Sequence, residues 1–359
     1  MAVEGRVVVI SARIGAGHDG AAGELDRRLS GLGFAVDRYD FLDLMPGRWG
    51  QRLCDAYHRE LEIAPSSWDW LLGALGKPPL SWAARAVARL ALPNLRDVLE
   101  PAPSVVVSTY PLASQALGVL RRRAELDAPV AAYLTDPSVH RLVVAGHCDL
   151  HIAPNEHAAA ATRRLGAAQV AVACPVVAPG FRPAQPGEQN RARRRFGLAE
   201  GERLALISSG SWGVGEVEEI AADVAATGAA FPVVVCGRND ALRERLRRAG
   251  VPRVFGWVDD MPTLLRACDV VVQNAGGLST LEGLATGLPV ITYRCLPGHG
   301  KANALVLDEI GLVQAVGCID TLKEALCSAR PPGLPAGADP ARILARLAGG
   351  VRTEEVPAA

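Results

Sequence analysis

Short runs of β-branched and other apolar residues recur along this chain, and each run is followed by a segment with apolar residues at helical spacing. Runs that are apolar on both faces are typical of parallel strands, which helices cover on both sides. The repeated strand-helix-strand units therefore predict an α/β fold built on doubly wound parallel sheets. The predicted strands are residues 7–10, 105–107, 130–134, 204–207, 233–236, 270–272 and 290–293.

The chain has 359 residues, which is more than one hydrophobic core usually serves, so we expect two domains. Residues 175–187 are too rich in proline and glycine for either core, and they predict the interdomain linker. The predicted domains are therefore 1–178 and 179–359, with a last helix over about residues 340–347. A long helical segment over about residues 43–93 is expected as an insertion in the first domain. Its aromatic residues are Trp49, Tyr57, Trp68, Trp70 and Trp82.

The formal net charge is zero, which argues against a nucleic-acid-binding protein and against recruitment to anionic lipid by overall charge. Only three of the 38 basic residues are lysine, so the arginine runs 121–123 and 193–195 are interpreted as solvated helix faces. The eight cysteines form no C-x-x-C pair and are expected as buried thiols in a reducing cytoplasm. Without a signal-peptide pattern or a long apolar stretch, a cytoplasmic protein is expected, either soluble or peripheral on a membrane.

The most informative segment is N-A-G-G-L-S-T-L-E over residues 274–282, which follows a predicted strand and opens a predicted helix. The backbone amides of Gly276, Gly277, Leu278 and Ser279 are suited to bind a phosphate or pyrophosphate, aided by the helix dipole. Glu282 lies one turn further on and can accept hydrogen bonds from two vicinal hydroxyls, such as those of a ribose. The same glycines also suit an ordinary strand-to-helix turn.

Two further polar segments follow predicted strands of the second half. The segment P-G-H-G-K-A-N over residues 297–303 places His299 and Asn303 where open α/β sheets bind ligands, and both side chains can bind sugar hydroxyls. The segment S-S-G-S-W-G-V-G over residues 208–215 is another glycine-rich turn, with Gly210 suited to supply an amide to the same pyrophosphate.

Two segments of the first half carry candidate catalytic residues. The segment S-A-R-I-G-A-G-H-D over residues 11–19 precedes a helix expected from about residue 19 to 32, and Gly15 and Gly17 permit a tight loop before it. That loop presents His18, whose imidazole can take a proton from a hydroxyl. The segment L-T-D-P-S-V-H over residues 134–140 presents Asp136 at the end of another strand, although an acid before proline also forms turns.

Taken together, these segments resemble the GT-B glycosyltransferases of family 28, in the branch of monogalactosyldiacylglycerol synthases and processive diacylglycerol glucosyltransferases. The motifs that carry the resemblance lie in order over about residues 5–328. They are S-A-x-x-G-x-G-H-x-x-A-A at 11–22, T-D-x-x-x-H at 135–140, C-G-R-N at 236–239, F-G-W-V-D-D-M at 255–261, G-G-L-S-T-L-E at 276–282, G-L-P at 287–289 and P-G-H-G-K-A-N at 297–303.

The resemblance implies two Rossmann-like domains that face each other across a cleft and transfer a hexose from a UDP-sugar with inversion, without a required metal or other cofactor. The uracil is expected near residues 256–258, the ribose at Glu282 and the pyrophosphate at the loops with Gly210 and Gly276. The donor-binding residues are then expected to be Gly17, Gly210, Ser211, Trp212, Gly237, Arg238, Trp257, Val258, Met261, Asn274, Gly276, Gly277, Leu278, Ser279, Glu282, His299, Gly300 and Asn303.

Two departures from the family pattern bear on the chemistry. Plant members have an aspartate, a candidate base, five positions before the glycine-loop histidine, where this chain has Arg13. The base is therefore expected to be His18, with Asp136 as the second choice. Many relatives read P-G-Q-E where this chain has His299 and Gly300, so the donor sugar stays open.

The acceptor is expected to be a diacylglycerol-like or other amphipathic alcohol, because relatives contact membrane and acceptor lipid through the aromatic insertion. Tryptophans interleaved with Arg48, Arg52 and Arg59 suit a helix at a membrane surface, and they equally suit an amphipathic helix packed on its own domain. The alternatives are a glycosyltransferase with a soluble natural-product acceptor, a UDP-sugar 2-epimerase, and a non-catalytic sensor of sugar nucleotides.

Overall fold

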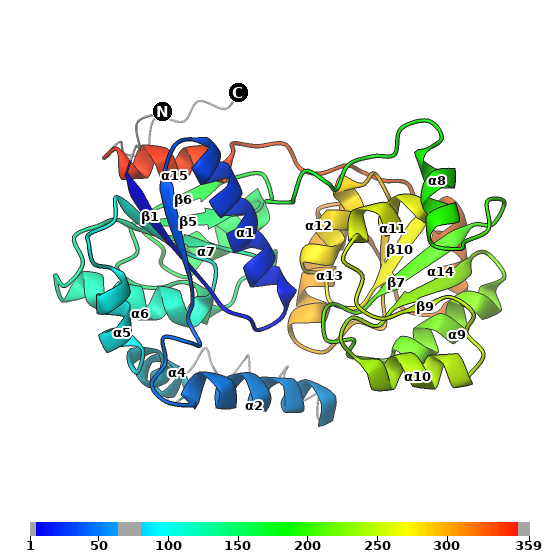
Figure 1. Cartoon of the computed structure of the whole chain (residues 1–359), viewed down its shortest axis with the longest axis horizontal. Coiled ribbons are helices and arrows are strands. Elements are labelled where there is room, and N and C mark those ends of the chain that lie inside the picture. The colour runs from blue at the N-terminus through cyan, green and yellow to red at the C-terminus, as the bar shows by residue number, and fades with distance from the viewer. Residues whose placement is uncertain (1–4, 64–79, 351–359) are drawn as a thin grey trace. The chain divides into compact units, whose positions relative to one another are not determined.

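The computed structural model describes residues 5–63 and 80–350. They form two compact units, the first made of residues 5–60, 80–176 and 335–350 and the second of residues 61–63 and 177–334. Each unit contains one six-stranded parallel sheet with helices on both faces (Figure 1). The predicted pair of doubly wound α/β domains is therefore confirmed.

The sheet of the first unit has the strand order β2-β1-β3-β4-β5-β6, and every neighbouring pair is parallel. The predicted runs 7–10, 105–107 and 130–134 form three of these strands, and the other three lie outside the predicted set. The strands are β1 (Arg6–Ser11), β2 (Ala35–Asp40), β3 (Val105–Ser108), β4 (Val130–Tyr133), β5 (Leu150–Ala153) and β6 (Val170–Val172).

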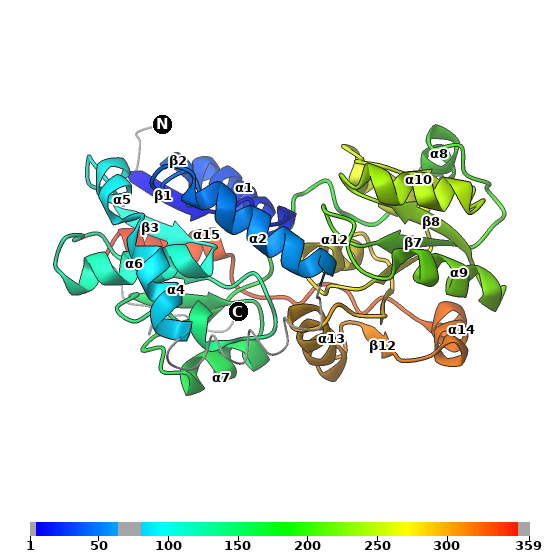
Figure 2. The same cartoon turned by 90° about the horizontal axis from the view of Figure 1, so that it is seen from below.

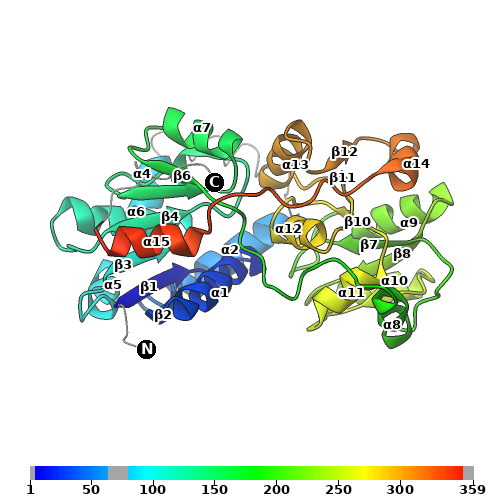
Figure 3. The ribbon, with the colours of Figure 1, turned by 90° about the horizontal axis from the view of Figure 1, so that it is seen from above.

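Alternate side chains of β1 enter two separate cores, because successive residues of a strand point to opposite faces of the sheet. Val8 and Ile10 pack with α4, α5 and α6, whereas Val7 and Val9 pack with α1 and α15. Figure 2 shows α4 beside α6, and Figure 3 shows α1 beside α15. The helices are α1 (Ala16–Gly31), α2 (Trp49–Ile63), α4 (Leu80–Arg89), α5 (Leu92–Val98), α6 (Pro111–Arg122), the 3-10 turn η1 (Arg141–Val143), α7 (Glu156–Arg164) and α15 (Pro340–Ala348).

The last helix, α15, belongs to the first unit, which differs from the prediction that residues 179–359 form one domain. Its apolar residues Ile343 and Leu344 are buried in the core that also holds Val7 and Val9. Asp339 caps the helix by accepting from the Ala341 amide, and it pairs with Arg28 of α1 at 3.2 Å. The chain therefore enters the second unit after residue 176 and returns to the first unit before residue 335.

The second sheet has the order β12-β11-β10-β7-β8-β9, again parallel throughout. Helices α9, α10 and α14 pack on one face, and α8, α11, α12 and α13 pack on the other. The strands are β7 (Leu204–Ser208), β8 (Phe231–Val235), β9 (Val254–Phe255), β10 (Val270–Gln273), β11 (Val290–Tyr293) and β12 (Gln314–Val316). The helices are α8 (Glu188–Arg195), α9 (Val217–Thr227), α10 (Asp240–Arg248), α11 (Met261–Ala267), α12 (Leu278–Ala285), α13 (His299–Glu309) and α14 (Ile319–Ser328).

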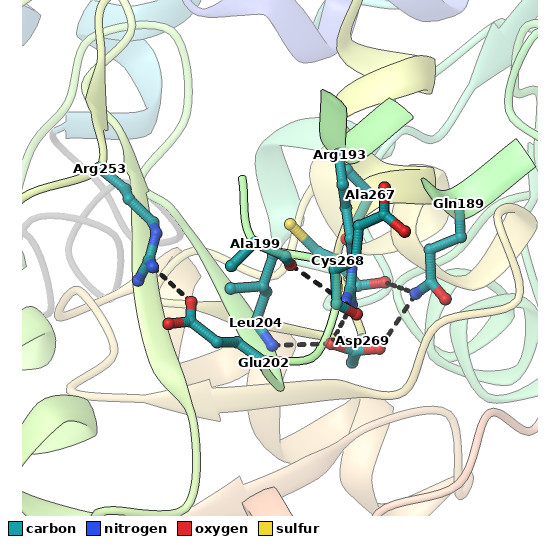
Figure 4. A network of polar contacts seen from close by, with 10 residues as sticks. Gln189, Arg193, Ala199, Glu202, Leu204, Arg253, Ala267, Cys268 and Asp269 are labelled. Atoms are coloured by element: carbon teal, nitrogen blue, oxygen red, sulfur yellow. Dashed lines mark hydrogen bonds and ion pairs between the residues drawn. The ribbon is translucent and has the colours of Figure 1, made fainter. Parts of the chain in front are cut away.

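The prediction of a solvated arginine face over residues 193–195 is wrong for Arg193, which is only 3% exposed. Its guanidinium donates to the carbonyls of Ala267 and Glu200 and to Asp269, which also accepts from the Leu204 amide (Figure 4). Burial of this charge is tolerated because an ion pair and carbonyl acceptors replace its water. Arg193 thereby fixes α8 to the start of β7 and β10.

The predicted aromatic insertion contains α2 and α4, and part of it, including Trp68 and Trp70, lies outside the described residues. Residues 41–48 connect β2 to helix α2, and Gly50 in the first turn of the helix lies against Leu42 of this connection. A Cβ at Gly50 would be 1.9 Å from the Leu42 carbonyl oxygen, so only glycine fits there. Trp49 is 49% exposed and Trp82 64% exposed, so both tryptophans present apolar surface to solvent.

The described residues bear on the expectations about membrane-spanning segments and about the cysteines. No helix within residues 5–63 and 80–350 is long and apolar enough to cross a membrane. Cys318 and Cys327 are exposed, so the expectation of buried thiols is wrong for these two residues.

Candidate functional site

Each unit has a point in its sheet where successive strands are added on opposite sides. In the first unit this point lies between β1 and β3, and in the second it lies between β7 and β10. Open α/β sheets bind ligands outside the carboxyl ends of the strands at such a point. The segments after these four strands are therefore the candidate sites, and each unit has its own.

His18 lies in the first turn of α1, directly after the segment that follows β1. The expected loop is shorter than predicted, because α1 already begins at Ala16 and Gly17 is helical; Gly15, directly before the helix, has a positive φ of 76°. The Nδ1 atom of His18 lies 2.6 Å from the Thr109 carbonyl oxygen, which only accepts. Nδ1 therefore carries the hydrogen, and Nε2 of the neutral ring keeps its lone pair.

His18 and Asp136 line the same pocket in the first unit, together with Tyr110, Ser114, Thr135 and Ser138. The Thr135 hydroxyl lies between the two candidate residues, 3.2 Å from His18 Nδ1 and 3.4 Å from Asp136 Oδ2. The His18 ring also contacts Tyr110 edge-to-face, with ring centroids 5.4 Å apart. The sequence thus identified two residues that the fold brings together from distant segments.

Tyr57 of α2 is a residue near this pocket that the sequence did not single out for chemistry. Burial and the nearby Asp136 carboxylate raise the pKa of Tyr57 to about 12, so the phenol keeps its proton near neutral pH. The sequence could not predict that Tyr57 lies near Asp136, because the two residues are far apart along the chain and strands β3 and β4 lie between them in the sequence. Thr109, which fixes the His18 tautomer, was likewise not predicted.

Arg13, which replaces an aspartate of the family pattern, is held by two carboxylates. Its guanidinium lies 3.0 Å from Asp40 and 2.6 Å from Asp43, and its backbone amide also donates to Asp40. Asp40 in addition accepts from the Leu42 amide. Arg13 therefore joins the segment after β1 to the segment after β2, and as a paired cation it is not a proton acceptor.

In the second unit, the segments after β7 and β8 approach each other at backbone contact distance. A Cβ at Gly237 would lie 2.4 Å from the Ser211 carbonyl oxygen, and one at Gly213 would lie 2.3 Å from the Cys236 carbonyl oxygen. The Arg238 amide donates to Ser211, and the Asn239 side chain donates to the Gly213 carbonyl. Only glycine allows this approach, so Gly213 and Gly237 are needed for the shape of the site.

The segment after β10 forms an open helix start, as predicted, but one of its expected donors is occupied. The Gln273 side-chain oxygen accepts from the amides of Ala275 and Gly276, at 2.8 and 2.6 Å. The amides of Gly277, Leu278 and Ser279 remain as donors, since the first turn of a helix has no internal acceptors for them. Gly277 provides no side-chain cap to α12.

Three residues expected to contact a donor sugar or its phosphates are instead packed between loops. Asn274 is fully buried and donates to the Val214 carbonyl at 2.9 Å. Asn303 is buried beside Gly276, where an added Cβ would lie 2.7 Å from Asn303 Cβ. A Cβ at Gly300 would lie 2.8 Å from the Asn274 carbonyl oxygen. These residues hold the segments after β7, β10 and β11 together.

The remaining residue of the P-G-H-G-K-A-N motif that was expected at the donor is His299. It is the first residue of α13 and is half-buried, so the expected polar loop is shorter than predicted. His299 therefore lies at a helix start that follows β11 after residues 294–298.

Trp257 and Arg238 form an exposed stack after β8 and β9. The Arg238 guanidinium lies 4.3 Å from the centre of the Trp257 ring, which is 48% exposed, and the indole nitrogen donates to Asp259 at 2.9 Å. Val258 and Met261 pack partly against the core on the α11 side. Ser211 and Trp212 are half-buried, while Gly210 is exposed with φ of 73°.

Glu282 lies on α12, one turn beyond the open amides. Burial raises the pKa of its carboxyl to about 8, and no charged neighbour contributes to the shift. Burial thus disfavours the charged form of this carboxyl group. Among the described residues, no group of three His, Cys, Asp or Glu side chains is arranged to hold a metal ion.

The chain resembles known proteins both in sequence and in structure. Residues 212–327 match the family model described as glycosyl transferases group 1. The processive diacylglycerol β-glucosyltransferase of Bacillus subtilis (strain 168) is 25% identical over 237 residues, which cover 64% of this chain and 61% of that protein. The corresponding enzyme of Bacillus mycoides is 27% identical over 242 residues, covering 64% and 60%. The chain thus spans about three fifths of the length of these relatives.

Two solved structures share the architecture of the chain. A UDP complex of UGT89C1 from Arabidopsis thaliana superposes with a TM-score of 0.57 at 16% identity, covering 90% of both chains. MurG of Acinetobacter baumannii superposes with a TM-score of 0.53 at 14% identity, covering 96% of this chain and 93% of that chain. The fold is that of GT-B glycosyltransferases.

Proposed function

We propose that the protein transfers a hexosyl group from a UDP-sugar to a hydroxyl of a lipid-like, diacylglycerol-type acceptor, with inversion at the anomeric carbon. The observation that carries the proposal is the open first turn of α12, which offers the amides of Gly277, Leu278 and Ser279 beside Glu282. The first unit carries the acceptor and its base, and the second unit carries the donor. No cofactor is part of the reaction.

The donor assignment is supported by the chemistry of the second unit. Backbone amides at a helix start attract a pyrophosphate, and a carboxylate one turn later accepts from two ribose hydroxyls. The exposed Trp257 ring offers a flat surface for a base, with Arg238 beside it. The Arabidopsis protein of the same fold was solved with UDP, which is consistent with this donor class.

His18 acts as the base in this proposal. Its Nδ1–H is engaged by the Thr109 carbonyl, so Nε2 can take the proton of the acceptor hydroxyl as that oxygen bonds to the anomeric carbon. The bond from the anomeric carbon to the UDP oxygen breaks in the same displacement. UDP leaves with the electron pair, and the positive end of α12 stabilises its charge. Asp136 is the alternative base, since it lines the same pocket.

The lipid acceptor is supported by the surface of the first unit. Trp49 and Trp82 are exposed on α2 and α4, and the Arg52 guanidinium lies 5.8 Å from the Trp49 ring centre. Exposed tryptophans beside arginines suit the interface between water and lipid headgroups. The two Bacillus relatives are named as processive diacylglycerol β-glucosyltransferases.

The test of the donor is a thermal-shift panel of UDP, GDP, dTDP and several UDP-sugars on the wild type and on Glu282→Ala. Specific binding raises the melting temperature by mass action, so UDP compounds alone are expected to stabilise the wild type. Glu282→Ala should lose most of that shift, whereas Glu324→Ala on α14 should keep it. Equal shifts with all nucleotides, or none with UDP compounds, would contradict the donor assignment.

The test of the acceptor is co-sedimentation with vesicles of phosphatidylcholine and phosphatidylglycerol. Replacement of Trp49 and Trp82 by alanine should reduce the bound fraction, while Phe231→Ala, which removes an exposed ring from the second unit, should not. Strictly soluble behaviour with transfer to a water-soluble alcohol would support a natural-product acceptor instead. Conversion of the UDP-sugar without any acceptor would support a 2-epimerase, and UDP binding without turnover would support a sensor.

A further inference from the structure

We propose that Arg294 is a positioning residue that sets how tightly the donor sugar is held, by fixing the segment after β11 to helix α9. The inference rests on the proposed UDP-sugar donor and goes beyond it. Arg294 lies outside the motifs of the chain, directly after β11 and before the P-G-H-G motif.

Arg294 is held on the α9 side by two carboxylates. Its Nε donates to Asp223 at 2.8 Å, and another of its nitrogens pairs with Glu216, the residue directly before α9. Asp223 also accepts from the Tyr293 hydroxyl at 2.9 Å, so two consecutive residues at the end of β11 are bound to one carboxylate. Two neighbouring contacts to one rigid helix restrict the chain direction more than an isolated surface ion pair does.

The backbone at Arg294 requires such a restraint. Its φ of 47° is in the left-handed region, which is unfavourable for a residue with a Cβ. A residue with a side chain keeps this conformation only where its surroundings hold it in place. Here the Asp223 and Glu216 carboxylates hold the Arg294 side chain. If residue 294 relaxed to an extended conformation, the chain after it would leave in another direction.

That chain direction determines where Leu296 lies. A Cβ at Gly215 would be 2.9 Å from a Leu296 methyl group, and one at Gly300 would be 2.9 Å from Leu296 Cβ. The Leu296 amide donates to the Asn274 carbonyl at 2.8 Å, and its carbonyl accepts from the Lys301 amide at 2.8 Å. Leu296 therefore sits between the segments after β7 and β10 and the start of α13.

A displacement of Leu296 would move the start of α13, where His299 lies, more than it would move α12. The segment before the amides of Gly277, Leu278 and Ser279 has a restraint of its own, because the Gln273 side-chain oxygen accepts from the amides of Ala275 and Gly276. The start of α13 is instead bound to Leu296 through the Lys301 amide. Loss of the Arg294 contacts should therefore weaken the hold on the hexose while leaving the hold on UDP nearly unchanged. Small errors in the position of a binding group are enough for large losses.

The experiment measures dissociation constants of UDP and of UDP-glucose, UDP-galactose and UDP-N-acetylglucosamine by calorimetry. Arg294→Gly is the main variant, because glycine accepts the left-handed conformation and removes only the side-chain contacts. We expect the UDP constant to stay within about twofold, and the constant of the best UDP-sugar to rise about tenfold. The control is Arg245→Ala, which removes an exposed ion pair between α10 and Glu218 of α9. It should change neither constant.

The outcomes separate this inference from the proposed function. Wild-type protein that binds no UDP compound contradicts the proposed function, and the inference falls with it. Wild-type protein that binds UDP-sugars, together with an Arg294→Gly variant that weakens UDP and UDP-sugar equally or not at all, overturns the inference alone. If Arg294→Gly does not fold, Asp223→Asn weakens the same contacts from the helix side and must show the same selective loss.

A structural measurement completes the test. Amide hydrogen exchange of residues 296–302 in the ligand-free protein should be faster in Arg294→Gly than in the wild type, while exchange in α12 should stay unchanged. A positioning role would be contradicted if residues 296–302 exchanged at the same rate in the variant and the wild type, or if exchange in α12 accelerated as much as theirs, whatever the ligand affinities are.

Discussion

The two units use the same sheet architecture for different kinds of site. In the first unit, side chains from distant segments converge, and the His18 tautomer is fixed by a carbonyl at the end of β3. In the second unit, the backbones themselves converge, and Gly213 and Gly237 allow contacts that no larger residue would permit. A proton acceptor needs a defined ring nitrogen, whereas an anion needs several amides directed at one place.

The largest expected effect tests whether the two sites have separate roles. His18→Ala should lower the rate of sugar transfer about 10³-fold, because a positioned base contributes about 10² to 10⁴. The melting-temperature shift caused by UDP should remain. His147→Asn, at an exposed residue with φ of 63°, is the control and should change neither quantity. A His18→Ala variant that also loses the UDP response would break the comparison.

The next effect contrasts glycines of the two units. Gly237→Ala places a Cβ 2.4 Å from the Ser211 carbonyl oxygen at a φ of 59°, and should lower the free energy of unfolding by about 3 kcal/mol. Gly17→Ala has nothing within 4 Å and lies in α1, so it should be neutral or slightly stabilising. Urea unfolding measures both. Equal stabilities of the two variants would show that the loops after β7 and β8 can move apart to accommodate an added methyl group.

A third effect separates two histidines of the first unit. His151 on β5 is 1% exposed, and neither ring nitrogen has a hydrogen-bond partner among the described residues. Burial lowers its pKa from 6.5 to about 4, so the unfolded chain takes up a proton that the folded chain refuses. Stability should fall as the pH decreases from 6.5 to 4, by about 2 kcal/mol at pH 5.

His151→Leu should remove this acid-dependent loss, and His147→Asn should retain it. The measurement is the urea midpoint at pH 7 and pH 5 for each variant. An unchanged acid response in His151→Leu would assign the loss to other groups.

The smallest expected effect concerns Glu282 in the second unit. Since burial raises its pKa to about 8, the carboxyl is mostly protonated at pH 7, and ribose binding to its ionised form must release the proton. UDP affinity should therefore rise about eightfold between pH 7 and pH 8.5. Glu282→Gln should give a flat profile in calorimetry. A flat profile in the wild type would mean that the ribose does not bind to an ionised Glu282.

The parts of the fold that the sequence predicted are those with strong local patterns. The runs that form β1, β7 and β10 are apolar on both faces and were found within two residues of their observed ends. Edge strand β2 was not predicted because its sequence is mostly polar, and β5 was missed because His151 interrupts its apolar run.

The candidate site was predictable as a set of segments, and less so in its detail. The segments around His18 and Gly277 could be predicted because glycines, and in one case a histidine, follow an apolar run directly. The occupied Gly276 amide and the buried Asn274 could not be foreseen, because their partners depend on how separate loops meet in space. The buried ion pair of Arg193 was missed for the same reason, since nothing local distinguishes it from Arg194 beside it.

The return of α15 to the first unit has a consequence for how the protein is made and recombined. Ile343 and Leu344 cover the same face of the sheet as Val7 and Val9, so this core is complete only after the residues up to about 348 have left the ribosome. The second unit is an insert within the first, with two junctions, near residues 176 and 335. An exchange of the second unit between related chains must therefore splice at both junctions, because a single fusion point would separate α15 from its core.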